Sequence, residues 1–148
     1  MIEEGEKLLL GVSGGKDSQS LLHVLLSFQK RAPVHFELAC ATMDPQTPSF
    51  DPSSVKDYMH VFGVPCYYRS ENIIERAMCE MNGDSLCRYC SRMNRGVLYT
   101  CCRKYGFNKL VLAQHWDDLA ESFLMSAMHN GQLRTMKQIC VRLASACD

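Results

Sequence analysis

The chain has 148 residues, of which 47% are hydrophobic and 22% charged, a balance typical of one soluble globular domain with its own core. Its formal net charge is zero at pH 7, so the total charge does not indicate nucleic-acid binding. From the acidic N-terminus and the lack of a long apolar run we expect no secretory leader, transit peptide or membrane span. Nine cysteines then indicate free thiols or metal ligation in a reducing compartment, which we expect to be the cytoplasm.

Short apolar runs alternate with stretches of helical periodicity along the chain. The predicted order is a strand at 7–12, a helix at 17–30, a strand at 36–42, a proline-rich loop at 43–52, a helix that Ser53 or Ser54 caps and Gly63 ends, a strand at 66–69, a helix at 71–81, a turn at 82–84, a helix at 91–105, a strand at 109–113 and a helix at 117–130. The last helix carries Leu119, Phe123, Leu124 and Ala127 on one apolar side and stops at Gly131. This order predicts an α/β fold, a parallel twisted sheet with helices on both faces.

Ligands of such sheets bind at the carboxyl ends of the strands, where residues 13–18, 43–48 and 114–118 fall. The first of these segments is the turn Ser-Gly-Gly-Lys-Asp-Ser. Its glycines let the backbone approach a ligand closely, and the amide groups of a turn and a helix start favour an anion. A flexible turn with a solvated Lys16 is the alternative. A Walker A loop is excluded because Leu10 stands where glycine is required and Asp17 where serine or threonine is required.

The turn resembles the signature of the PP-loop ATP pyrophosphatases, an adenine nucleotide alpha hydrolase-like group, in its Ser-Gly-Gly-Lys-Asp-Ser form. The resemblance implies that the turn holds the β,γ-diphosphate of ATP while a substrate atom attacks the α phosphorus and pyrophosphate leaves. The implied nucleotide-binding residues are Ser13, Gly14, Gly15, Lys16, Asp17 and Ser18, together with Ala41 and Met43 at the adenine. Lys16 and Asp17 are also implied to be catalytic.

Cys87 and Cys90 form a Cys-x-x-Cys pair, which by itself is half of a zinc or iron–sulfur site, or a redox dithiol. The segment from Cys87 to Tyr99 is similar to the Cys-x-x-Cys-Ser-Arg-x-x-Arg-Gly-x-Leu-Tyr segment of the tRNA 2-thiocytidine biosynthesis proteins. The resemblance implies a [4Fe–4S] cluster held by Cys87, Cys90 and a third cysteine farther along. One iron then stays open for sulfur, and Arg92 and Arg95 meet tRNA phosphates unless they are ordinary exposed helix residues.

Asp117 and Asp118 follow the fourth predicted strand, in a segment that resembles the family's Gly-His-His-x-Asp-Asp turn. Ala113 and Gln114 depart from that pattern. The two carboxylates can cap a helix, or they can hold Mg²⁺ against the phosphates as catalytic metal ligands, which we favour. His115 fits a packing role as well as a catalytic one.

Two groups of residues have less specific interpretations. The segment 81–110 is basic, with Arg88, Arg92, Arg95, Arg103, Lys104 and Lys109 against Asp84, and is either a nucleic-acid surface or a solvated helix face. The cysteines interpreted as core packing are Cys40, Cys66, Cys79, Cys101 and Cys102.

Residues 137–148 do not match the family, and neither Cys140 nor Cys147 is identified as the third ligand. We therefore expect a partial PP-loop ATP-binding domain at 1–136, with an exposed sheet edge that favours association, including a homodimer. The implied function is an ATP-dependent tRNA sulfurtransferase that adenylates and thiolates C2 of an anticodon-loop cytidine, with tRNA and a cysteine desulfurase system as partners. Alternatives are another PP-loop tRNA modifier, such as a lysidine synthetase, or a non-catalytic form that binds ATP or metal.

Overall fold

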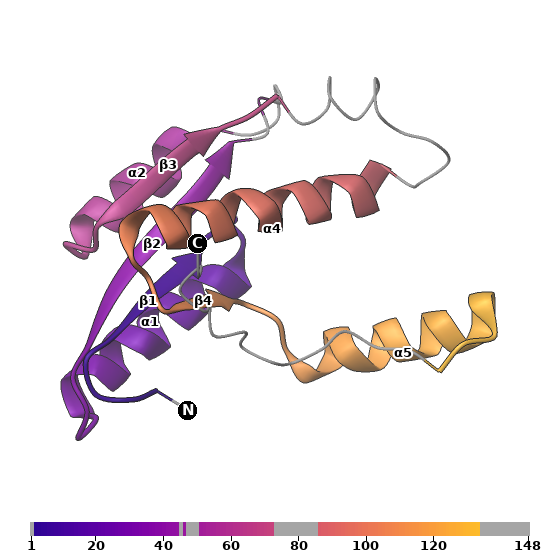
Figure 1. Ribbon diagram of the computed structural model, residues 1–148, viewed down its shortest axis with the longest axis horizontal. Helices are drawn as coiled ribbons and strands as arrows, with labels where there is room; N and C mark the ends of the chain where they lie inside the picture. The colour runs from indigo at the N-terminus through magenta and orange to yellow at the C-terminus, as the bar shows by residue number, and fades with distance from the viewer. Residues whose placement is uncertain (1, 45, 47–50, 73–85, 134–148) are drawn as a thin grey trace, which may run out of the picture.

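A computed structural model describes residues 2–44, 46, 51–72 and 86–133, apart from the side chains of residues 52 and 86–88. Its centre is a four-stranded parallel sheet in the order β3-β2-β1-β4 (Figure 1). The strands are β1 (Glu6–Gly11), β2 (Phe36–Asp44), β3 (Cys66–Ser70) and β4 (Lys109–Leu112). The predicted fold class is confirmed.

β1 is one of the two inner strands of the sheet, and its side chains pack into the core on both faces. Leu8, Leu9 and Leu10 are each 1% exposed or less, because successive side chains of a strand point to opposite faces and both faces are covered. Leu8 and Leu10 pack on the face shared with α1 (Lys16–Arg31) and α2 (Pro52–Val61). Leu9 packs on the other face, against Cys101 and Cys102 of α4 (Leu86–Tyr105). The helices therefore form one layer on each side of the sheet.

Several predicted boundaries move in the structure. β2 continues to Asp44 because its end pairs with β3, through Met43 opposite Arg69 and Asp44 opposite Ser70. α2 is capped by the Asp51 carboxylate, which accepts the Ser53 N–H at 2.9 Å, and not by Ser53 or Ser54. α4 begins at Leu86, so the Cys-x-x-Cys pair lies in its first turn, five residues before the predicted start at Ser91. The predicted helix at 71–81, the turn at 82–84 and Cys79 lie almost wholly outside the described residues.

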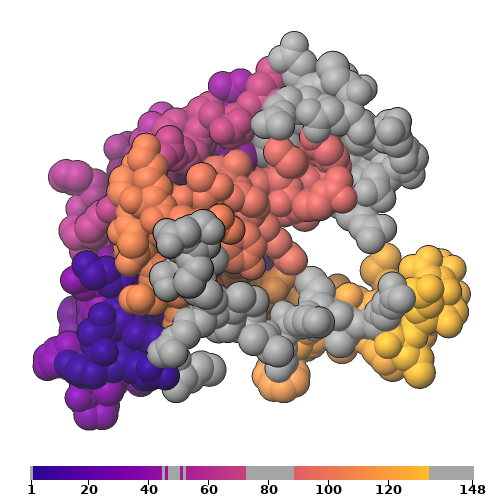
Figure 2. Space-filling view, viewed as in Figure 1, coloured from indigo at the N-terminus to yellow at the C-terminus, as the bar shows by residue number. Residues whose placement is uncertain are grey.

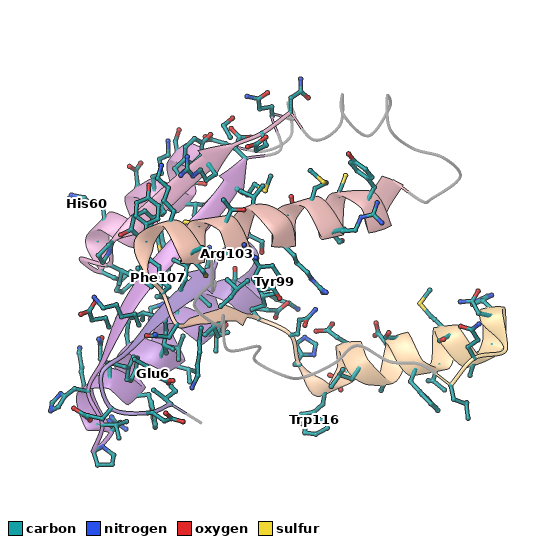
Figure 3. The ribbon with its side chains drawn as sticks, in the orientation of Figure 1. Glu6, His60, Tyr99, Arg103, Phe107 and Trp116 are labelled. Atoms are coloured by element: carbon teal, nitrogen blue, oxygen red, sulfur yellow. The ribbon has the colours of Figure 1, made fainter. Side chains whose placement is uncertain are left out.

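α5 (Trp116–Asn130) extends away from the sheet and buries none of its residues (Figures 1 and 2). Of its predicted apolar side, Phe123 is 40% and Leu124 56% exposed, because no element in the described part of the chain covers it. Trp116, at the start of the helix, points outward with 77% of its surface exposed (Figure 3). The helix ends at Gly131, whose φ of 60° is the left-handed conformation expected after a helix C-terminus.

Lys109 belongs to a buried ion pair at the amino ends of the strands, not to a basic surface. Its Nζ lies 2.6 Å from Glu6 Oε2, and the two side chains are 12% and 8% exposed. The interpretation of Lys109 as part of a nucleic-acid surface is therefore wrong. Among the described residues, no helix is both long and apolar enough to cross a membrane.

Candidate functional site

The 13–18 turn lies at the carboxyl edge of the sheet, between the ends of two neighbouring strands. Gly11 of β1 is opposite Ala41 of β2 on one side and Leu112 of β4 on the other. The chain just beyond each of these strands is therefore delivered to the same edge, where ligands of parallel sheets bind. The predicted gathering of the three segments is confirmed for the part that the structure describes.

Gly14 gives the turn its shape. Its φ is +84°, a conformation that side-chain-bearing residues rarely adopt. A Cβ on Gly14 would also lie 3.2 Å from Val55 Cγ2, so glycine lets α2 approach the turn closely. Gly15 then caps α1 with an ordinary φ of −77° and with no side chain bonded to the first amides of the helix. Those amides, and the positive end of the helix dipole, are available to an anion.

The carbonyl groups of the two glycines are held by side chains of α1. Ser18 Oγ donates to the Gly15 carbonyl at 2.9 Å, and Gln19 Nε2 donates to the Gly14 carbonyl at 3.2 Å. Ser13 Oγ lies 3.4 Å from Ser18 Oγ and also accepts a hydrogen bond from the Gly15 N–H at 3.5 Å. The turn is thereby fixed in one shape while the Lys16 and Asp17 side chains stay exposed.

A pocket of about 430 Å³ opens between the turn and α2. It is lined by Ser13, Gly14, Gln19, Asp51, Ser54, Val55 and Tyr58. Only Ser13 and Gly14 of these are predicted from the sequence, because the α2 wall depends on tertiary packing. A hydrogen bond of 2.6 Å between His23 and Tyr58 joins α1 to α2 beside this wall. The hydrogen bond from the Ser53 N–H lowers the pKa of the Asp51 carboxyl below its usual value.

Ala41 and Met43, which are predicted to contact the adenine, differ in how accessible they are to a ligand. Ala41 is 2% exposed, and its carbonyl already accepts the Val12 N–H at 2.9 Å. Met43 is half-buried at the end of β2, beside Tyr89, Cys90 and Met93 of α4. Met43 is therefore the residue of the two that a base can reach, and the adenine contact stays a prediction.

Cys90 is the member of the cysteine pair that lies close to this edge of the sheet. It is a free, half-buried thiol that packs, as Met43 does, against Tyr89, which is 4% exposed. Cys87 is three residues earlier in the same helical turn, a spacing that places two residues on one side of a helix. A soft thiolate pair suits iron–sulfur ligation, so the donor chemistry fits the implied cluster. The described residues contain no third ligand grouped with Cys90.

Other cysteines are packing residues, as predicted. Cys40, Cys101 and Cys102 are at most 1% exposed. Burial raises the pKa of the Cys40 thiol to about 12, with a smaller contribution from Cys66, and burial also raises the pKa values of the Cys66 and Cys101 thiols. These thiols stay protonated near neutral pH and are poor ligands or nucleophiles.

Asp118 caps α5. Its Oδ2 accepts the His115 N–H at 2.9 Å and lies 3.7 Å from His115 Nδ1. The Asp117 side chain is 89% exposed, with its Oδ2 4.0 Å from His115 Nδ1. The structure therefore shows the capping role for Asp118. The second oxygen of Asp118 and the Asp117 carboxylate stay available to a cation. The Mg²⁺ role of the pair stays a prediction.

Arg92 and Arg95 are exposed on α4, one and two turns after the cysteine pair begins. The Arg92 guanidinium lies 5.6 Å from the centre of the Tyr89 ring. Arg103 is exposed on the same helix, eight residues after Arg95. The side chain of Arg88 and all of Asp84 lie outside the description. The contact of these arginines with RNA stays a prediction.

The chain matches the PP-loop domain family over residues 2–146. It is 38% identical over 139 residues to the tRNA-cytidine(32) 2-sulfurtransferase of Bordetella pertussis, a match that covers 92% of this chain and 43% of that protein. It is also 38% identical over 141 residues to the enzyme of the same name from Anaeromyxobacter dehalogenans, covering 92% and 47%.

A solved structure of U34-tRNA thiolase NcsA from Methanococcus maripaludis with its [4Fe–4S] cluster has the same fold, with a TM-score of 0.74 at 18% identity. That match covers 88% of this chain and 45% of the thiolase chain. The chain therefore spans less than half the length of these relatives. The family match runs to residue 146, and the predicted domain boundary at 136, like Cys140 and Cys147, lies outside the described residues.

Proposed function

The chain belongs to the PP-loop domain family, and from this premise we propose that it is the ATP-binding part of a tRNA 2-thiocytidine sulfurtransferase. ATP activates C2 of a cytidine in the anticodon loop of tRNA, and sulfur then replaces the activated oxygen. The named activity of the relatives from Bordetella and Anaeromyxobacter supports this choice of reaction.

The observation that carries the proposal is the position of Cys90 relative to the nucleotide edge. Cys90 and Met43, which lies at the end of β2, both pack against Tyr89, and β2 is hydrogen-bonded to the strand that leads into the 13–18 turn. One edge of the sheet thus holds an anion-binding turn and a thiol suited to sulfur chemistry. A PP-loop enzyme that only joined an amine to the cytidine would have no use for this thiol.

The turn binds the β,γ-diphosphate of ATP through its free amides, and Lys16 neutralises the charge of the leaving pyrophosphate. Asp117 and Asp118 would hold Mg²⁺, which supplies charge neutralisation at the phosphates. The C2 oxygen of cytidine attacks the α phosphorus, the bond between the α and β phosphates breaks, and pyrophosphate departs with the electron pair. A carbonyl oxygen is a poor leaving group, whereas AMP is a good one, which is why activation must precede sulfur transfer.

Cys87 and Cys90 would hold the [4Fe–4S] cluster, which when bound supplies the site that carries sulfur. Arg92 and Arg95 contact tRNA phosphates from the exposed side of α4, beside the cysteine pair. The sulfur comes from a cysteine desulfurase system, and the reaction takes place in the cytoplasm. The exposed apolar residues of α5 favour a homodimer.

The test is mass spectrometry of tRNA nucleosides from cells that lack this gene. We expect 2-thiocytidine to be absent and to return with the wild-type gene. Cys90→Ala and Lys16→Ala should fail to restore it, whereas Cys66→Ala, a half-buried thiol away from the pair, should restore it. Unchanged 2-thiocytidine in the deletion, or loss of lysidine in its place, would contradict the proposal. Restoration by Cys90→Ala would show that the cysteine pair is not used.

A further inference from the structure

Gln19 lies on the first full turn of α1 with its side-chain amide directed back to the nucleotide turn. Its Nε2 donates to the Gly14 carbonyl at 3.2 Å, and the residue also lines the pocket. We propose that Gln19 is a positioning residue that keeps the Gly14 carbonyl away from the bound diphosphate. This inference rests on the proposed function, since it assigns the diphosphate to this turn.

The physical reason is the geometry of the peptide unit between Gly14 and Gly15. In a trans peptide the C=O and the N–H point in opposite directions, so the direction of one determines that of the other. With its carbonyl bonded to Gln19 on the α1 side, this peptide directs its N–H away from the amide of Gln19, on the side of Ser13 Oγ, which accepts it in a long hydrogen bond of 3.5 Å. Rotation of the peptide would instead direct a carbonyl dipole at the phosphate oxygens, which repel it.

Two consecutive glycines make such a rotation easy, because neither residue has a Cβ that restricts φ and ψ. Ser18 provides the second restraint, with its Oγ bonded to the Gly15 carbonyl at 2.9 Å. Ser18 is 3% exposed, whereas Gln19 faces the pocket. Ser18 belongs to the recognised signature and Gln19 does not, so Gln19 is a feature of this chain that the motif does not include.

The variant Gln19→Met tests this role because methionine keeps the length of the side chain and its helix propensity but cannot donate a hydrogen bond. Gln29→Met is a matched control. Gln29 lies near the other end of α1, and its Nε2 donates to the Phe36 carbonyl at 2.8 Å, a bond of the same kind remote from the pocket. Both variants lose one amide-to-carbonyl hydrogen bond, so a purely structural effect should be similar in the two.

Dissociation constants for ATP, inorganic pyrophosphate and AMP are measured by calorimetry with Mg²⁺ on the full 148-residue chain. Gln19→Met should weaken ATP and pyrophosphate by about 3- to 10-fold, the range for one lost neutral hydrogen bond. AMP, which lacks the β and γ phosphates, should change by less than about twofold, again on that energy scale. Gln29→Met should change none of the three. Equal weakening of ATP and AMP, or no change for Gln19→Met, would overturn the proposal.

A measurement on the wild-type protein decides the question even if Gln19→Met fails to fold. In amide NMR spectra, pyrophosphate should shift the backbone N–H signals of Gly15 and Lys16 but leave the side-chain amide pair of Gln19 nearly in place. A large shift of that pair would identify Gln19 as a direct phosphate ligand and would overturn the positioning role. If the wild-type chain binds neither ATP nor pyrophosphate, the proposed function fails, whereas binding without dependence on Gln19 rejects only the inference.

Discussion

Gly14→Ala separates the conformational requirement of the nucleotide turn from its chemistry. Alanine at a φ of +84° is strained by about 1 to 2 kcal/mol. The new Cβ would in addition meet Val55 Cγ2 at 3.2 Å, a contact that requires a small shift of α2. We expect a loss of about 1 to 3 kcal/mol in the free energy of unfolding, which lowers the melting temperature by about 2 to 10 °C for a domain of this size.

Gly15→Ala is the matched control in the adjacent position. Its φ of −77° is open to alanine, and its added Cβ would lie 3.5 Å from Ser13 Oγ, an ordinary contact. Its stability should stay within about 0.5 kcal/mol of the wild type, because the restriction that alanine places on the unfolded chain offsets its lower preference for the N-cap position. Urea unfolding followed by circular dichroism measures both variants. Val55→Ala is itself destabilising because Val55 is a buried core residue, so a double-mutant cycle of Gly14→Ala with Val55→Ala isolates the part of the loss due to contact. Equal stability of Gly14→Ala and Gly15→Ala would refute the reasoning.

Three further predictions concern other parts of the fold. Lys109→Met should destabilise the chain by about 3 to 5 kcal/mol in urea unfolding, because it leaves a buried carboxylate unpaired, whereas Lys7→Met, which breaks an exposed pair, should cost less than about 1 kcal/mol. A similar loss for both would show that the first pair is not effectively buried. Asp118→Ala should lower the free energy of unfolding by about 1 kcal/mol because it removes a capping hydrogen bond, whereas Asp117→Ala should leave it almost unchanged. Both variants should weaken the binding of Mg²⁺·ATP in calorimetry. Unchanged binding in both would leave capping as the only role.

The third prediction concerns the Cys40 thiol, whose pKa is raised from 9.0 to about 12 by burial. The folded state keeps the thiol protonated, so its stabilising contribution is complete below pH 9 and is lost as pH rises from 9 towards 12, where the unfolded chain releases the proton first. Cys40→Ala should show a shallower decline of stability over that range, and an unchanged decline would contradict the assignment.

The succession of strands and helices along the chain and the nucleotide turn could be predicted because their causes are local. The buried run of leucines in β1 and the break into Ser-Gly-Gly-Lys-Asp-Ser mark strand, turn and helix without reference to the rest of the chain. The Asp51 cap could also be predicted, because a proline at the first helical position after an aspartate is a helix start signal. The serines that follow are equally good caps by type, and only the structure separates them.

Other features depend on contacts that are distant in the sequence. The extension of β2 to Asp44 follows from its pairing with β3, and the α2 wall of the pocket follows from the contact of Val55 with the turn. The ion pair between Glu6 and Lys109 joins residues 103 positions apart. The predicted helix is present as α5, but the periodicity of its apolar residues does not reveal whether a neighbour covers them.

The most direct test of the ATP site is the identity of the nucleotide product. The purified protein is incubated with tRNA, a sulfur source and ATP labelled at the α phosphate, and the products are separated by chromatography. We predict AMP and pyrophosphate, with the AMP lost in Lys16→Met and retained in Lys30→Met at the other end of the same helix. Release of ADP and inorganic phosphate, or no more AMP than Lys16→Met forms, would contradict the account.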